Sequence, residues 1–216
     1  MASQQGLTAG PYLERLPQTA NPNFTTSCKQ INEGDDLTFF LSSTAYRDLM
    51  TWLLQLNRSM FPHRSNEGKV EDCRLDSPPR YSETVQSLRS LLTDLEALIK
   101  EAPPDTDPRR FGNVAFRTWY ISAERDAGDL IERHLATVLE HWDGEGVREE
   151  LKVYLLGSFG SSQRLDYGTG HELSFLAFLG CLWKLGAFED GEKRAIVVGL
   201  IQPYVPIPSP SCRYRC

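Results

Sequence analysis

The chain has few cysteines and no paired spacing among them, so two common kinds of stabilising cross-link are not expected. The five are Cys28, Cys73, Cys181, Cys212 and Cys216, and no two of them are separated by only two residues. This odd, scattered set argues against a disulfide framework and against a structural zinc site. Reduced thiols are typical of a protein located in the cytoplasm, or in both the cytoplasm and the nucleus.

An excess of positive charge, a leader segment and a long apolar run are also lacking. The 216 residues carry 29 acidic and 23 basic side chains, a net charge of −6, so we expect neither nucleic acid nor a membrane as a partner. The first residues, MASQQGLTAGPYLERL, have no apolar core behind basic residues and predict no secretory signal. The longest near-apolar run, Leu173 to Leu185, is too short for a membrane span and predicts a buried, central helix.

Strand-like alternation is absent as well, and helical periodicity takes its place. In the clearest helix, Glu83 to Glu101, the apolar residues form one stripe, Ser82 is the expected N-cap, and the following prolines end the helix. The fold class is therefore all-α, with no sheet of more than two short strands. The predicted helices are Thr44–Asn57, Glu83–Glu101, Asn113–His141, Val147–Leu156, Glu172–Leu185 and Glu192–Ile201, with a polar loop from Phe61 to Tyr81.

Composition divides the chain into three parts. Residues 1–35 are rich in Pro, Asn, Thr, Ser and Gln and predict a flexible N-terminal arm. Residues 36–201 form the helical domain. Residues 202–216 hold four prolines, so this Pro-rich tail is not expected to continue a helix.

The densest candidate site is the segment Gly157–Glu172, GSFGSSQRLDYGTGHE, which joins two predicted helices. Its four glycines would let backbone approach a ligand closely, and it ends at a helix N-terminus, where free N–H groups favour anions. Arg164 could pair with phosphate or carboxylate. Asp166 and Glu172 could share a divalent cation, and His171 could relay a proton or bind a ligand.

A tightly built interhelix loop is the alternative interpretation of the same residues. Thr169 and Glu172 have capping-box spacing, so Glu172 could satisfy backbone N–H groups. Asp166 could pair with Arg164 or with turn amides. The glycine pattern matches neither a Walker A loop nor GxGxxG, and no strand precedes it, which argues against an independent ATPase.

A second candidate segment, Arg109–Tyr120, reads RRFGNVAFRTWY and follows a Pro-rich linker. Three arginines and several aromatic residues would suit an anion or a partner peptide. The alternative is that Phe116, Trp119 and Tyr120 belong to the core while the arginines face solvent.

These two segments carry a resemblance to a known family. RLDYGTGHE, from Arg164 to Glu172, and RFGNVAFRTWY, from Arg110 to Tyr120, resemble two specific motifs of the phosphotyrosyl phosphatase activators. Two further stretches resemble the family's N-terminal half: LLQLNRSMFP and SLRSLLTDL. The sequence as a whole resembles that of a fungal member. The resemblance runs from about Ile31 to about Leu200, where family members continue with further helices. A helical bundle of the phosphatase-activator type, without its C-terminal part, is therefore expected.

The resemblance implies an activator and assembly chaperone of the protein phosphatase 2A catalytic subunit. It also implies peptidyl-prolyl cis/trans isomerase activity on a proline-containing peptide, with ATP and Mg²⁺ at the surface shared with the phosphatase and with Asp166 and Glu172 as expected metal ligands. The alternative is a non-enzymatic scaffold or an inactive, truncated product. The positions that match the family motifs are Arg110, Gly112, Asn113, Arg117, Gly160, Arg164, Asp166, Tyr167, Gly168, Thr169, Gly170, His171 and Glu172.

Overall fold

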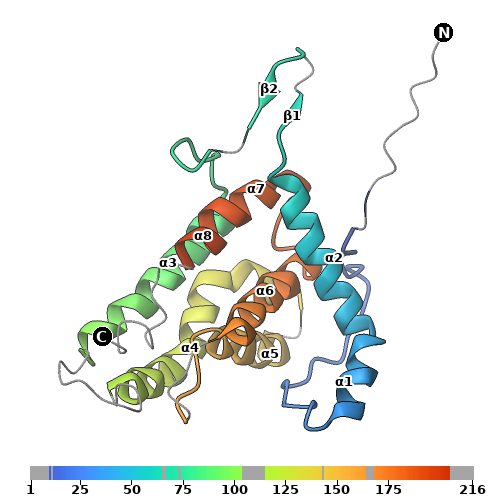
Figure 1. Cartoon of the computed structure of the whole chain (residues 1–216). Helices are drawn as coiled ribbons and strands as arrows, with labels where there is room; N and C mark the ends of the chain where they lie inside the picture. Colours follow the sequence, from blue (N-terminus) through green and yellow to red (C-terminus); the bar gives the residue numbers. More distant parts are fainter. Residues whose placement is uncertain are drawn as a thin grey trace.

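The structure is a computed structural model that describes residues 10, 12–64, 67–72, 74–103, 115–142, 144–163 and 168–204. Within these residues the fold is all-α, as the sequence predicts (Figure 1). The α-helices are α1 Gly34–Leu41, α2 Thr44–Ser59, α3 Glu83–Ala97, α4 Ala115–Leu139, α5 Gly144–Gly157, α6 Thr169–Lys184, α7 Lys193–Ile196 and α8 Gln202–Tyr204. None of these described helices is both long and apolar enough to cross a membrane.

Short elements fill some of the connections. The 3₁₀ turns η1 Leu98–Lys100 and η2 Asp190–Glu192 follow α3 and precede α7, and the π-helical turn η3 Val197–Ile201 joins α7 to α8. Strands β1 His63–Arg64 and β2 Val70–Glu71 pair antiparallel inside the predicted loop. The structure also contains α1, which the periodicity does not reveal because it is short and buries no residue.

Serine residues cap the N-termini of two long helices, α2 and α3. The Ser82 hydroxyl accepts a hydrogen bond from the Val85 N–H at 3.2 Å, which confirms the predicted cap of α3. The Ser43 hydroxyl does the same for the Tyr46 N–H of α2, also at 3.2 Å. Each bond satisfies one of the N–H groups that a helix leaves without an internal partner.

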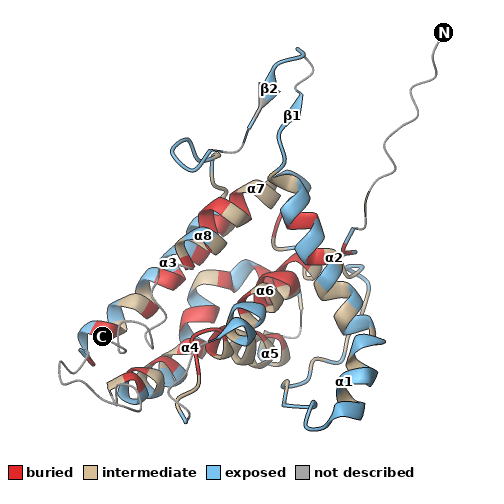
Figure 2. Cartoon of the chain, in the orientation of Figure 1, coloured by how far each residue is buried: buried red, intermediate tan, exposed pale blue. Residues whose placement is uncertain are grey.

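The core lies where α6 packs between α2 and α5, with α4 joining α5 to α3 (Figure 2). The near-apolar composition of α6 follows from this central place, because neighbours cover it on more than one side. The buried residues of α6 are Phe175, Phe178, Leu179, Gly180, Leu182 and Trp183.

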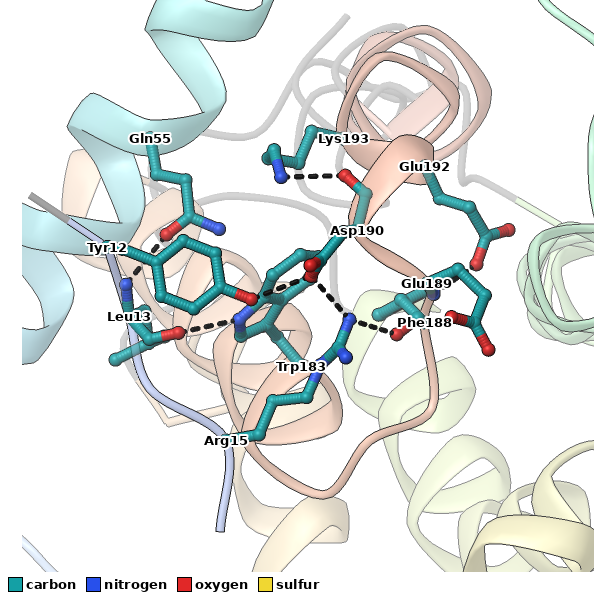
Figure 3. Close-up of polar contacts among 10 residues, drawn as sticks. All are labelled: Tyr12, Leu13, Arg15, Gln55, Trp183, Phe188, Glu189, Asp190, Glu192 and Lys193. Carbon is teal, nitrogen blue, oxygen red and sulfur yellow. Dashed lines mark hydrogen bonds and ion pairs between the residues drawn. The ribbon is translucent and has the colours of Figure 1, made fainter. Parts of the chain in front are cut away.

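Residues 12–24, here called the strap, are packed on the helices, which corrects the prediction of a flexible arm for this stretch. Leu13 is 4% exposed, and its N–H donates to Gln55 Oε1 at 2.7 Å (Figure 3). Its carbonyl accepts from the Trp183 indole N–H at 2.8 Å. The burial of Leu13 and its two hydrogen bonds thus hold a segment whose average composition predicts disorder.

Charged groups fix the beginning of the strap to the turn before α7 (Figure 3). Asp190 accepts hydrogen bonds from the Tyr12 hydroxyl at 2.7 Å and from Arg15 at 2.9 Å. The Tyr12 hydrogen bond and the nearby Arg15 charge hold the pKa of the Asp190 carboxyl below its usual range. The Arg15 guanidinium also lies 4.8 Å from the centre of the Trp183 ring, a cation–π contact.

The helix continues past residue 202, which corrects the prediction that this part of the tail leaves the helical fold. α8 runs through Pro203 to Tyr204, directly after the π-helical turn. Proline fixes φ near a helical value, but it lacks an N–H and its ring crowds the carbonyl of the preceding turn. Tyr204 is 3% exposed, so its burial offsets that loss. Residues 205–216 of the predicted tail lie outside the described residues.

Candidate functional site

The loop between α5 and α6 rests on a layer of aromatic rings. Phe159 is 2% exposed, and its ring lies 5.5 Å from Trp119 of α4 and 6.0 Å from Tyr204 of α8. Tyr204 stacks on Phe175 of α6, with ring centres 3.9 Å apart. Phe116 and Trp119 are each 1% exposed, which confirms that they belong to the core. Aromatic side chains of α4, α6 and α8 therefore support this loop.

Two side chains tie the ends of the loop together. His171 Nδ1 lies 2.6 Å from the Gly157 carbonyl oxygen, so we assign the proton to Nδ1. The Tyr204 hydroxyl donates to the carbonyl of Ser158, a fully buried residue, and lies 3.4 Å from the His171 carbonyl. These contacts hold the last turn of α5 against the first turn of α6. Nδ1 of His171 thus has a structural role that the sequence does not reveal.

Gly160 and Arg117 shape the first half of the loop. Gly160 has φ of +121°, which strongly favours glycine, and another residue would cost about 1–3 kcal/mol in strain. Arg117 Nε donates to the Ser162 carbonyl at 3.1 Å, although the arginine is exposed. This bond joins the two candidate segments, Arg109–Tyr120 and Gly157–Glu172, through residues that lie 45 positions apart.

Among the described residues, no N-cap side chain bonds to the N-terminus of α6. Gly168 is the N-cap, with extended backbone and no side-chain hydrogen bond, so the predicted capping box of Thr169 and Glu172 does not form. Glu172 lies exposed in the first turn. A Cβ atom added at Gly168 or Gly170 would meet no described atom within 4 Å. Packing within the described residues therefore does not require glycine at either position.

A hollow of about 670 Å³ lies at this open helix end and also involves the segment Ser27–Lys29 before α1. Ser27 donates to the Tyr154 hydroxyl at 3.0 Å, which fixes this segment against α5. Burial raises the pKa of Tyr154. The Lys29 ammonium and the positive end of the α6 dipole would both favour an anionic group. Sequence reasoning missed Ser27, Cys28 and Lys29 because nothing in their local pattern indicates contact with residues so distant in the chain.

The predicted site residues fall into two sets. Arg117, Gly160 and the run from Gly168 to Glu172 converge on the loop and the start of α6. The others lie outside the described residues: Arg110, Gly112, Asn113, Arg164, Asp166 and Tyr167.

The metal prediction rests on one described carboxylate. Glu172 is exposed beside the loop, and its expected partner Asp166 lies outside the described part. No group of three or more His, Cys, Asp or Glu side chains in the described residues could hold a metal ion. Carboxylates of this kind suit Mg²⁺ when phosphates and waters complete its shell. The two-carboxylate magnesium site stays a prediction.

The helical fold is that of a known class of phosphatase activators. It is similar to a crystal structure of "the PP2A phosphatase activator Ypa1 PTPA1", with 31% identity and a TM-score of 0.77 over 94% of this chain and 61% of that chain. Residues 27–209 match the family described as "Phosphotyrosyl phosphate activator (PTPA) protein". The chain belongs to this family, and the match extends somewhat beyond the predicted range at both ends.

Curated fungal relatives carry the name "Serine/threonine-protein phosphatase 2A activator 1". The chain is 50% identical to the protein of Emericella nidulans over 205 residues, which cover 90% of this chain and 48% of that protein. It is 33% identical to the protein of Schizosaccharomyces pombe, covering 90% of this chain and 54% of that protein. The chain thus spans about half the length of these relatives.

Proposed function

We propose that this chain activates the catalytic subunit of a protein phosphatase 2A-type enzyme, acting as an assembly chaperone that docks through the α5–α6 loop. One observation carries the proposal: aromatic packing anchors the loop, yet no described atom lies within 4 Å of a Cβ added at Gly168 or Gly170. Glycines that the surrounding residues do not require are suited to close approach by another molecule. The names of the relatives indicate what that molecule is.

ATP with Mg²⁺ is part of the proposal, bound at the surface shared with the phosphatase. The N–H groups of Thr169 and Gly170, in the first turn of α6, and the Lys29 ammonium would hold phosphate oxygens, with Arg164 as an additional partner. Glu172 and Asp166 would hold the magnesium ion. When bound, the nucleotide and metal would supply the charges that join the two proteins.

We further propose peptidyl-prolyl cis/trans isomerase activity, located in the hollow beside the loop. Val153 and Tyr154 give this hollow an apolar wall against which a prolyl ring could lie. Isomerisation breaks no covalent bond, and the site has only to lower a rotational barrier of roughly 18–20 kcal/mol. A location in the cytoplasm or nucleus fits the described cysteines Cys28 and Cys181, which are both free thiols.

A matched pair of glycine substitutions tests the docking face. Gly170→Leu places a side chain at the open end of α6, and Gly34→Leu places the same side chain at the start of α1, where an added Cβ also meets nothing within 4 Å. Both variants should unfold at or above the wild-type temperature, because leucine has a higher helix propensity than glycine. Activation of purified phosphatase 2A catalytic subunit, with ATP and Mg²⁺, should be lost only in Gly170→Leu. Equal activation by the two variants would rule out this end of α6 as the docking face.

The nucleotide arm of the proposal is tested separately. Arg164→Ala and Asp166→Ala should abolish activation while the unfolding temperature stays unchanged. If both properties fall in proportion, the two residues support the loop and do not contact a ligand. A folded Asp166→Ala protein with full activity would exclude its role in metal binding.

A further inference from the structure

A second hollow of about 470 Å³ lies under the strap, between the strap, α2, α5 and α6. Small-molecule sites usually measure roughly 300–1,000 Å³ and are mainly apolar. This one has aromatic side chains from four elements: Phe24 of the strap, Phe40 of α1, Trp52 of α2 and Tyr154 of α5. Tyr154 also lines the loop hollow, but the other walls differ.

Three charged side chains line this second hollow, and their charges do not balance. Asp48 and Lys184 form an ion pair at 2.7 Å, so these two charges offset each other. Glu150 remains as an additional carboxylate: Lys184 acts on it through charge but is paired with Asp48, and among the described residues its hydrogen bond is a long one, 3.4 Å, from the Thr25 N–H. Burial raises the pKa of Glu150, because removing a carboxylate from water disfavours its charged form.

Apart from Lys184, which is bound to Asp48, the described ionisable groups at the hollow carry no positive charge. Cys181 of α6 is partly buried, and its removal from water raises its pKa to about 12, so the thiol stays neutral. Burial also raises the pKa of Tyr154, whose hydroxyl therefore stays neutral near pH 7. An anionic ligand would meet the Glu150 charge in an apolar setting, where repulsion is poorly screened.

We propose that this second hollow binds an apolar organic amine, with its hydrocarbon part among the aromatic side chains and its ammonium group against Glu150. A cation placed here gains both a charge-assisted hydrogen bond and the negative faces of the neighbouring rings. The carboxylate in turn gains the partner that its long bond to Thr25 does not provide. This site is independent of the phosphatase proposal, because it uses neither the loop glycines nor their hollow.

Two ligands of equal shape test the charge requirement. 2-Naphthylmethylamine is cationic near pH 7, and 2-naphthylmethanol is its uncharged counterpart. Calorimetric titration of the whole chain should show the amine binding at least about tenfold more tightly, as expected for a charge-assisted bond. Glu150→Gln keeps the shape of the side chain and should remove this preference.

Two further variants locate the binding. Ala177→Leu, which enlarges a residue lining the hollow, should weaken both ligands. Phe39→Ser alters a residue that is 76% exposed on α1 and should change neither, provided that unfolding temperatures confirm folding. Failure of the amine to bind, equal affinity for amine and alcohol, or a preference that survives Glu150→Gln would each overturn the proposal.

Discussion

Removing the hydroxyl of Tyr204 should loosen the α5–α6 loop while leaving the helical bundle folded. That hydroxyl donates to the carbonyl of Ser158, a residue with 0% exposure, so its loss leaves a buried acceptor without this donor. Tyr204→Phe should therefore cost about 1–3 kcal/mol of unfolding free energy. The ring itself is retained, and with it the stacking on Phe175 and the edge contact with Phe159.

Tyr204→Ala removes the ring as well and should cost about 3–5 kcal/mol, because a cavity then opens under the loop. Urea unfolding followed by tryptophan fluorescence measures both values. Hydrogen exchange distinguishes a local from a global effect: in Tyr204→Phe, the amide of Phe159 should exchange faster while amides of α3 keep their protection. A cost below about 0.5 kcal/mol for Tyr204→Phe, or equal costs for the two variants, would refute the role given to the hydroxyl.

Two further predictions concern Cys181 and Glu150, which both line the second hollow. Iodoacetamide at pH 8, followed by peptide mass spectrometry, should label exposed Cys28 but spare Cys181 until the chain unfolds, because burial raises the Cys181 pKa to about 12. The pKa of Glu150 is raised on folding, so this group favours the folded state at low pH, and its contribution is lost as pH rises through the folded-state pKa. Glu150→Gln should therefore have a higher unfolding temperature than wild type at pH 7, and the difference should shrink toward pH 4. A constant difference across that range would contradict the assignment.

Apolar periodicity predicts a helix well when the residues that become buried are spaced along that same helix. The stripe of α3 is an example, since Val85, Leu88 and Leu92 are buried on the face that the spacing indicates. α6 is another, because its apolar composition matches its central position. In both cases the signal lies within one continuous segment, so no knowledge of distant partners is needed.

The strap shows why other parts could not be predicted. Its composition is polar, and the interactions that hold it are with residues far along the chain: Gln55, Trp183 and Asp190. Each partner also has an ordinary role within its own segment, so neither side of a contact indicates the other. The hairpin β1–β2 is missed for a different reason, because each strand has only two residues and shows no alternation.

The assignment of the candidate site to the α5–α6 loop stays a prediction, but the contacts around this loop differ from those that local spacing suggests. Local spacing suggests that Thr169 and Glu172 cap α6, yet the tertiary contacts of His171 and Tyr204 hold that helix end, and Gly168 takes the cap position. Once the cap is not needed, the exposed glycines of this end have no structural explanation among the described residues. Gly160 does have one, because its positive φ excludes most side chains. The two glycines therefore differ in what a substitution should change. Substitution at Gly160 should lower the free energy of unfolding, whereas substitution at Gly170 should weaken binding to a partner.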